Sequence, residues 1–163
     1  SFDLDQPLSL RVAHGAAASP FAAAVQGKTY LCEENPMGIT RFSLEFGEDG
    51  AACFHYWNAQ GEQRLEFGMQ RNLYGKFPQR GYSDEYGNVH ELTDFRYDCA
   101  ASAGWIEPQK LQLQVQIIDR YFGGLTITFG FVDETLVGVR MVKAAEDFLD
   151  EYEGWMTGHL SGD

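Results

Sequence analysis

The sequence lacks long apolar runs, is poor in basic residues and contains only three cysteines. No stretch approaches the roughly 20 apolar residues that cross a bilayer, and the start lacks the basic flank and continuous apolar stretch of a signal peptide. The 12 Lys and Arg residues face 24 Asp and Glu residues, so the net charge is −12. Like charges repel, which disfavours nucleic acids and anionic membranes as partners. We expect a cytoplasmic protein that binds neither.

Metal and cofactor sites have no recognisable pattern in the chain. Cys32, Cys53 and Cys99 are widely spaced, with no C-x-x-C pair and no histidine at metal-ligand spacing. These features favour buried free thiols in a reducing compartment. The four histidines are scattered along the chain, so we predict no metal site and no cofactor.

Catalytic motifs are equally scarce. The sequence contains no S-x-x-K, G-x-S-x-G, H-E-x-x-H or phosphate-cradling loop. The tripeptide Tyr56-Trp57-Asn58 fits a Y-x-N element, but three residues with one wildcard are more typical of an ordinary strand. We predict no catalytic residue. An open alternative is a small enzyme in a barrel mouth, with Asp94 or Glu107 and His90 as acid and base.

A two-residue alternation of polar and apolar side chains dominates what is present. It is clearest in Lys110–Ile117 and Gly124–Phe131, and it predicts antiparallel strands with one buried face. Eight such strands match the number that closes a small barrel around side chains or one small ligand. We predict an all-β, eight-stranded antiparallel barrel. The predicted strands are Gly27–Glu33, Ile39–Phe46, Ala51–Asn58, Glu62–Phe67, Asp94–Ala101, Lys110–Asp119, Gly124–Val132 and Thr135–Lys143.

Three segments differ from this pattern. Residues 1–25 show no sustained periodicity and are expected to form a tether, leaving residues 26–143 for the barrel domain. Residues 68–93 are rich in Gly, Tyr and charged side chains, which predicts a long functional or mobile loop. In residues 144–163, large apolar side chains recur at spacings of three and four, which predicts a short acidic amphipathic helix.

Large side chains on or near the predicted strands are the candidates for a ligand site. Core packing explains most of the aromatic rings, because rings dominate buried area, but a minority are expected to line a barrel mouth. Two arginines on strands are candidate polar anchors there, although a solvent-facing position is the commoner one. The candidate ligand-binding residues are Arg41, Phe54, Tyr56, Trp57, Trp105, Phe129 and Arg140.

Four short segments suggest a family. Gly27-Lys28-Thr29-Tyr30, Glu34 to Ile39, Phe42 to Phe46 and Leu65-Glu66-Phe67-Gly68 form an arrangement of glycines, aromatics and turn residues. It resembles the C-terminal lipocalin-like domain of bacterial β-lactamase-related serine hydrolases, a penicillin-binding-protein-like family. The resemblance implies an eight-stranded barrel without a nucleophile of its own, attached to a bacterial catalytic domain that carries the S-x-x-K and Y-x-N residues.

Two functions are therefore expected. The first is a non-catalytic accessory domain that packs on a serine hydrolase domain of the same chain or mediates homodimerisation. The second is a free-standing lipocalin-like barrel that binds a small apolar ligand. The long loop and the tail provide the predicted partner contacts, which are Tyr82, Tyr86, Phe148, Tyr152 and Trp155.

Overall fold

The computed structural model describes residues 12–80, 96–118, 123–145 and 152–162. These residues form one five-residue helix and ten strands, arranged in a single sheet. The elements are α1 (Phe21–Val25), β1 (Thr29–Cys32), β2 (Arg41–Phe46), β3 (Ala51–Asn58), β4 (Gly61–Met69), β5 (Leu73–Arg80), β6 (Arg96–Glu107), β7 (Lys110–Ile117), β8 (Gly123–Asp133), β9 (Leu136–Ala145) and β10 (Tyr152–Leu160). No helix in the described part of the chain is long and apolar enough to span a bilayer.

The alternation of side chains determines which face of each strand is buried. On β7, the odd-numbered residues Leu111, Leu113 and Val115 are fully buried, while the glutamines between them are partly exposed. In the register with β8, Leu111 faces Phe129 and Leu113 faces Ile127, so apolar side chains meet on the inner face. The prediction of antiparallel strands with one buried face is therefore confirmed.

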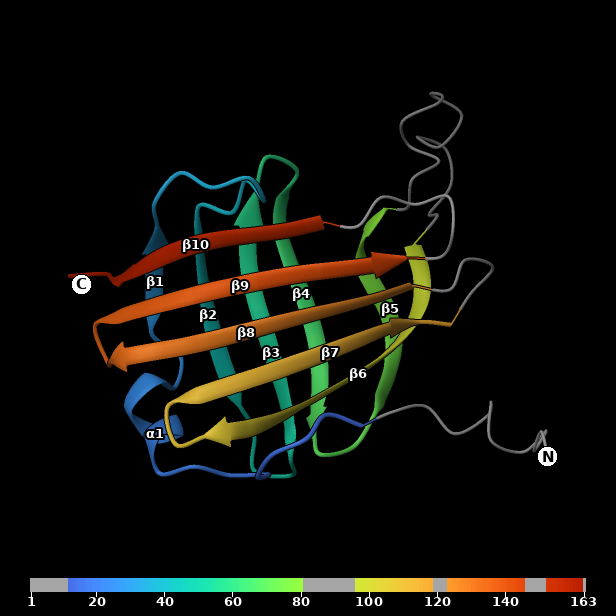
Figure 1. Cartoon of the computed structure of the whole chain (residues 1–163), viewed down its shortest axis with the longest axis horizontal. Coiled ribbons are helices and arrows are strands. Elements are labelled where there is room, and N and C mark those ends of the chain that lie inside the picture. The colour runs from blue at the N-terminus through green and yellow to red at the C-terminus, as the bar shows by residue number, and fades with distance from the viewer. Residues whose placement is uncertain (1–11, 81–95, 119–122, 146–151, 163) are drawn as a thin grey trace.

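The sheet closes on itself. The strand order runs β4-β3-β2-β1-β10-β9-β8-β7-β6, and β6 then returns to β4 through the parallel pairs Gly68–Ser102 and Met69–Ala103. β5 pairs with the first part of β6 and lies beside this nine-strand closure as an extra strand. Figure 1 shows β1–β5 crossing behind β6–β10, so the core lies between two layers of strands. The fold is thus an all-β closed barrel.

The predicted number of strands and the C-terminal helix were wrong. Leu73–Arg80, which falls inside the predicted long loop, forms β5. Residues 152–160 form β10, which pairs with β9 on one side and with β1 on the other. The physical reason is that β10 fills the position between β1 and β9, so the sheet has no open edge there. Gly154, Met156 and Gly158 point inward, whereas Trp155 is exposed.

The described part of the predicted tether packs against the barrel. The amide of Ala13 donates a buried hydrogen bond of 2.8 Å to Oγ of Ser102, and Ala16 pairs with Trp105 through two backbone hydrogen bonds. Val25, at the end of α1, is fully buried. Residues 13–25 therefore cover part of the barrel, including the outer side of β6.

Candidate functional site

Interlocking aromatic rings fill much of the barrel interior. Phe42, Phe54 and Phe129 are fully buried, and their ring centroids lie 5.2 to 5.7 Å apart. Tyr30 stacks on Phe42 at 5.5 Å, and Tyr56 stacks on Phe54 at 4.7 Å. Rings at these distances are in favourable contact. This part of the interior is therefore a packed core.

Tyr30 combines this core position with a hydrogen bond to the turn between β8 and β9. Its hydroxyl donates to the carbonyl oxygen of Glu134 at 2.7 Å. Burial, assisted by the charges of Glu134 and Asp133, raises the pKa of Tyr30 to about 12. The Tyr30 hydroxyl therefore keeps the proton that it donates to Glu134, even well above physiological pH.

The end of the barrel where β7 and β9 end and β8 begins is apolar, but it is less completely buried than the aromatic core. Ile117 ends β7, Leu125 lies near the start of β8, and Met141 lies near the end of β9, so all three occupy the same end. Each continues the inward-facing series of its strand and is partly buried against the core, as is Phe77 of β5. These four side chains, here called the apolar end, leave apolar surface that a small ligand can cover.

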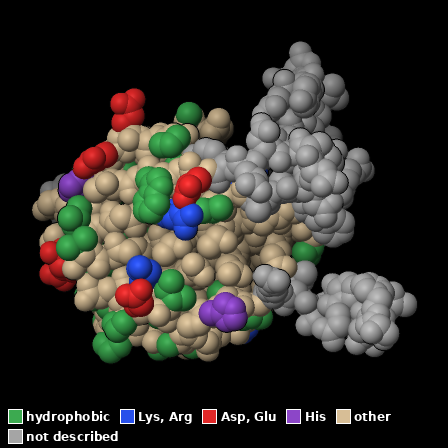
Figure 2. Space-filling model, in the orientation of Figure 1, with side chains coloured by type: hydrophobic (Ala, Val, Ile, Leu, Met, Phe, Trp, Pro, Cys, Tyr) green, Lys and Arg blue, Asp and Glu red, His purple; other side chains and the backbone are tan. Residues whose placement is uncertain are grey.

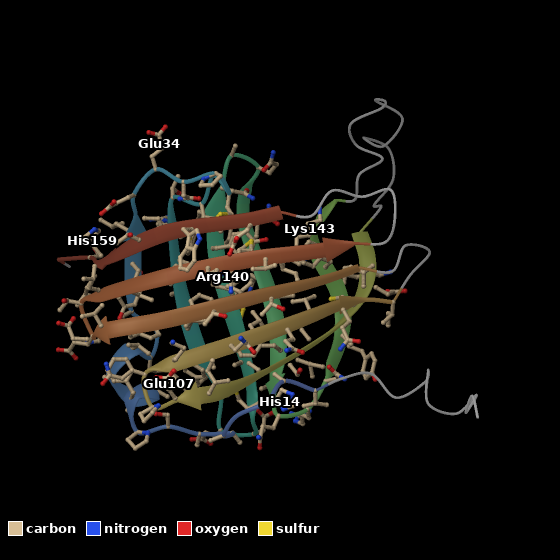
Figure 3. All side chains as sticks on the ribbon, viewed as in Figure 1. His14, Glu34, Glu107, Arg140, Lys143 and His159 are labelled. Carbon is tan, nitrogen blue, oxygen red and sulfur yellow. The ribbon has the colours of Figure 1, made fainter. Side chains whose placement is uncertain are left out.

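Lys143 brings a polar group to this end. It lies two residues beyond Met141 on the inward-facing series of β9, and its register partner on β8 is Leu125. The residue is half-buried, and burial lowers the pKa of its ammonium. Figure 3 labels Lys143 near the end of β9, away from Arg140 in the middle of that strand. A cation beside apolar side chains suits a ligand with an anionic head group.

A small cleft is lined by residues of β4, β5 and β6. Its volume is about 180 Å³, below the roughly 300 Å³ of the smaller ligand pockets. Burial raises the pKa of the Cys99 thiol to about 11, so the thiol is neutral and weakly nucleophilic at physiological pH. The cleft alone therefore offers neither room for a ligand nor reactive chemistry. It is lined by Arg64, Glu66, Tyr74, Gly75, Lys76 and Cys99.

The structure separates the predicted ligand-binding residues into two groups. Phe54, Tyr56, Trp105 and Phe129 are buried in the core. The other three lie on the outer surface, because their strands alternate and the inward positions belong to their neighbours. The guanidinium of Arg41 lies 4.2 Å from the ring centroid of Trp57, and that of Arg140 lies 5.6 Å from the ring centroid of Trp155. Neither arginine reaches the interior as an anchor.

Most of the remaining predicted residues lie outside the described part of the chain. Glu107 is exposed and pairs with Lys110 at 3.2 Å, while Asp94 and His90 fall outside the described residues. Tyr82, Tyr86 and Phe148 also fall outside them, as does the side chain of Tyr152. Trp155 is the predicted partner contact that the structure describes, with 62% of its surface exposed.

Sequence reasoning missed the residues of the apolar end. Ile117, Leu125 and Met141 carry a usable signal, since each is the inward-facing apolar residue nearest one end of a predicted strand. Phe77 carries no such signal, because it lies in the segment predicted as a loop. Among the described residues, no group of three or more His, Cys, Asp or Glu side chains is placed to hold a metal ion.

Comparisons with known proteins identify the fold. A crystal structure of the fatty acid-binding protein in brain tissue of Drosophila melanogaster matches with a TM-score of 0.53 and 7% sequence identity, covering 83% of this chain and 98% of that chain. The chain has the fold of a fatty-acid-binding-protein-like β-barrel. No protein-family model matches it, and neither does any curated protein sequence.

This result supports part of the predicted fold. The prediction of a lipocalin-like barrel is confirmed only at the coarser level of an all-β closed barrel with a fatty-acid-binding-protein-like fold. The comparisons give no support to the resemblance to a domain of β-lactamase-related hydrolases. At 7% identity, the structural likeness concerns the fold alone.

Proposed function

We propose that this chain is a non-catalytic barrel that binds a small apolar ligand carrying an anionic head group. The proposal is carried by one observation, which is the placement of the half-buried Lys143 beside Leu125 and Met141 at the apolar end. The likeness to a protein named for fatty-acid binding supports it. The acyl part would cover Phe77, Ile117, Leu125 and Met141, and the carboxylate would lie at Lys143.

The packed core limits where the ligand lies. Because Phe42, Phe54 and Phe129 occupy the interior, a ligand cannot run through the whole barrel without displacing rings. A partial insertion buries less apolar area than full enclosure does, so we expect a dissociation constant in the micromolar range or weaker. The NMR resonances of the four methionine methyl groups can report directly where the ligand binds.

The test is a titration of the chain, labelled with ¹³C at the methionine methyls, with oleate. We expect the Met141 methyl to shift and saturate, while the Met37 methyl, in the connection between β1 and β2, stays in place. Leu125→Gln should weaken binding about tenfold or more, because it puts a polar amide in the apolar end. Val132→Gln is the matched control, since Val132 lies on the same strand and is 67% exposed.

A second titration isolates the head group. Lys143→Met should weaken oleate binding while leaving binding of the uncharged oleyl alcohol nearly unchanged. Equal losses for both ligands would contradict a role for the ammonium. No saturable shift with either ligand in the wild-type chain would contradict the binding function itself.

The filled core favours a second function, that of an accessory domain. A barrel packed with rings can serve as a rigid body that docks on a neighbouring catalytic domain, as in the predicted relation to a β-lactamase-like serine hydrolase. The chain alone should then show no turnover of an activated ester or a β-lactam. An in-frame S-x-x-K and Y-x-N upstream of Ser1 in the coding region would support this function, and turnover by the chain itself would contradict it.

A further inference from the structure

The outer face of the sheet formed by β7, β8 and β9 carries almost no charge. Its outward positions between the strand ends hold glutamine, threonine, glycine and valine, apart from Arg140. Figure 2 shows this face as a broad area of uncharged polar side chains and backbone, with few charged groups. The residues that form it, here called the neutral face, are Gln112, Gln114, Gln116, Thr126, Thr128, Gly130, Gly138 and Val142.

The opposite side of the barrel shows that this neutrality is not general. The outward positions of β2, β3 and β4 include five charged side chains within three neighbouring strands. Depletion of charge is typical of the centre of protein interfaces, where a charge would lose its water. The charged residues on that opposite side are Arg41, Glu45, Glu62, Arg64 and Glu66.

An aromatic side chain and one ion pair border the neutral face. Trp155 of β10 is 62% exposed and faces Arg140 directly across the strands. Nε of Arg140 lies 2.5 Å from Oε2 of Glu153, and its guanidinium lies over the Trp155 ring. Tryptophan and arginine are the side chains most enriched at the energetic centres of interfaces. Trp155 and Arg140 therefore give the border of the neutral face the residue types found at interface centres.

We propose that the neutral face, with Trp155, Arg140 and Glu153, is a docking surface for a second copy of this chain. Charge complementarity selects this occupant. A two-fold axis beside the pair brings Arg140 of one copy to Glu153 of the other, and the reverse, so the border is self-complementary. Each copy carries a net charge of −12, and the neutral face is where two such copies meet with the least repulsion.

The size of the face indicates a weak dimer. The proposed surface extends over β7, β8, β9 and the neighbouring β10. Four strands about 4.8 Å apart and about 26 Å long present roughly 500 Å² per copy. The total of roughly 1,000 Å² is near the lower limit of specific interfaces, so the dimer should form and dissociate reversibly. This inference is independent of the ligand at the apolar end.

The experiment is sedimentation velocity of the full chain from low micromolar to near-millimolar concentration. The wild type should shift reversibly from monomer to dimer. Gly138→Glu should raise the dimer dissociation constant about tenfold or more, because two like charges then meet in the neutral face. A Cβ at Gly138 meets nothing closer than 4.0 Å, so the variant should fold. Gly75→Glu is the matched control, because it adds the same charge on β5, where a Cβ also has open space.

A charge exchange tests the predicted contact itself. Arg140→Glu and Glu153→Arg should each be monomeric alone, since each places like charges across the axis. A mixture of the two should form a heterodimer in which both cross-contacts are again opposite in charge. A wild type that stays monomeric, or a dimer that Gly138→Glu leaves intact, would overturn the proposal. Failure of the mixture to associate would overturn the Arg140–Glu153 contact.

Discussion

Single residues on β6 decide how the N-terminal segment attaches to the barrel. Gly104 lies under this segment, and a Cβ built there would be 2.0 Å from the carbonyl oxygen of His14. Because the obstacle is backbone, no side-chain rotation can relieve it. The glycine is therefore required by close approach of two chain segments, a role that the sequence alone does not reveal.

Gly104→Ala should detach or displace residues 13–16 and lower the free energy of unfolding by about 1–3 kcal/mol. Urea unfolding followed by circular dichroism measures the loss. The control is Gly138→Ala, a substitution in a strand where a Cβ has ordinary space. Similar stability of the two variants would contradict the close packing of His14 on Gly104.

At the scale of strands, the alternation predicted most of the barrel correctly and failed at three places. It missed β5 and β10, and it ended β6 at Ala101 although this strand continues to Glu107. β7 and β8 have regular alternation, and each was predicted to within about two residues of its observed ends. β5 was missed because Pro78 and the charged residues around it are typical of loops and edges. At β10, Trp155 and Met156 fitted a helical spacing, so the sequence alone favoured a helix. The alternation of inward and outward side chains becomes clear only when β10 pairs with β1 and β9.

The candidate site was less predictable than the fold. The sequence indicates which residues are large or charged, but not whether rings meet in the centre of the barrel. Arg41 and Arg140 fell on the outer face because their neighbours Phe42 and Val139 are fully buried. Lys143 continues the inward series of its strand, so its position could have been inferred from the same alternation.

The strand assignment of residues 152–160 makes a sharp prediction about two adjacent positions. Met156 points inward and is 4% exposed, whereas Trp155 points outward. Met156→Glu should lower the free energy of unfolding by about 3 kcal/mol or more, because it buries an unpaired charge. Trp155→Glu should change it by no more than about 0.5 kcal/mol. Chemical denaturation of both variants gives the comparison, and equal losses would contradict the alternation.

The whole molecule keeps several weakly acidic groups buried in their neutral form. Burial raises the pKa of Cys32 and of Cys99 to about 11, and it also raises the pKa of Tyr56. The pKa of Tyr30 is likewise raised to about 12. In the folded state, all these groups therefore stay protonated to a higher pH than they do in the unfolded chain. Their ionisation therefore links folding to alkaline pH.

Proton binding determines whether the stability of the fold rises or falls with pH. Below pH about 9, these cysteines are protonated in both the folded and the unfolded state, so they do not change the free energy of unfolding. Above pH about 9, the unfolded chain loses these protons first, which lowers the free energy of unfolding. Stability should fall from pH about 9 to about 11 through Cys32 and Cys99, by about 1 kcal/mol for each at pH about 10, and then further through Tyr30. Urea midpoints measured across this range test the prediction. Cys99→Ala should reduce the slope, and a stability that stays constant up to pH about 10 would show that these thiols are not held neutral by the fold.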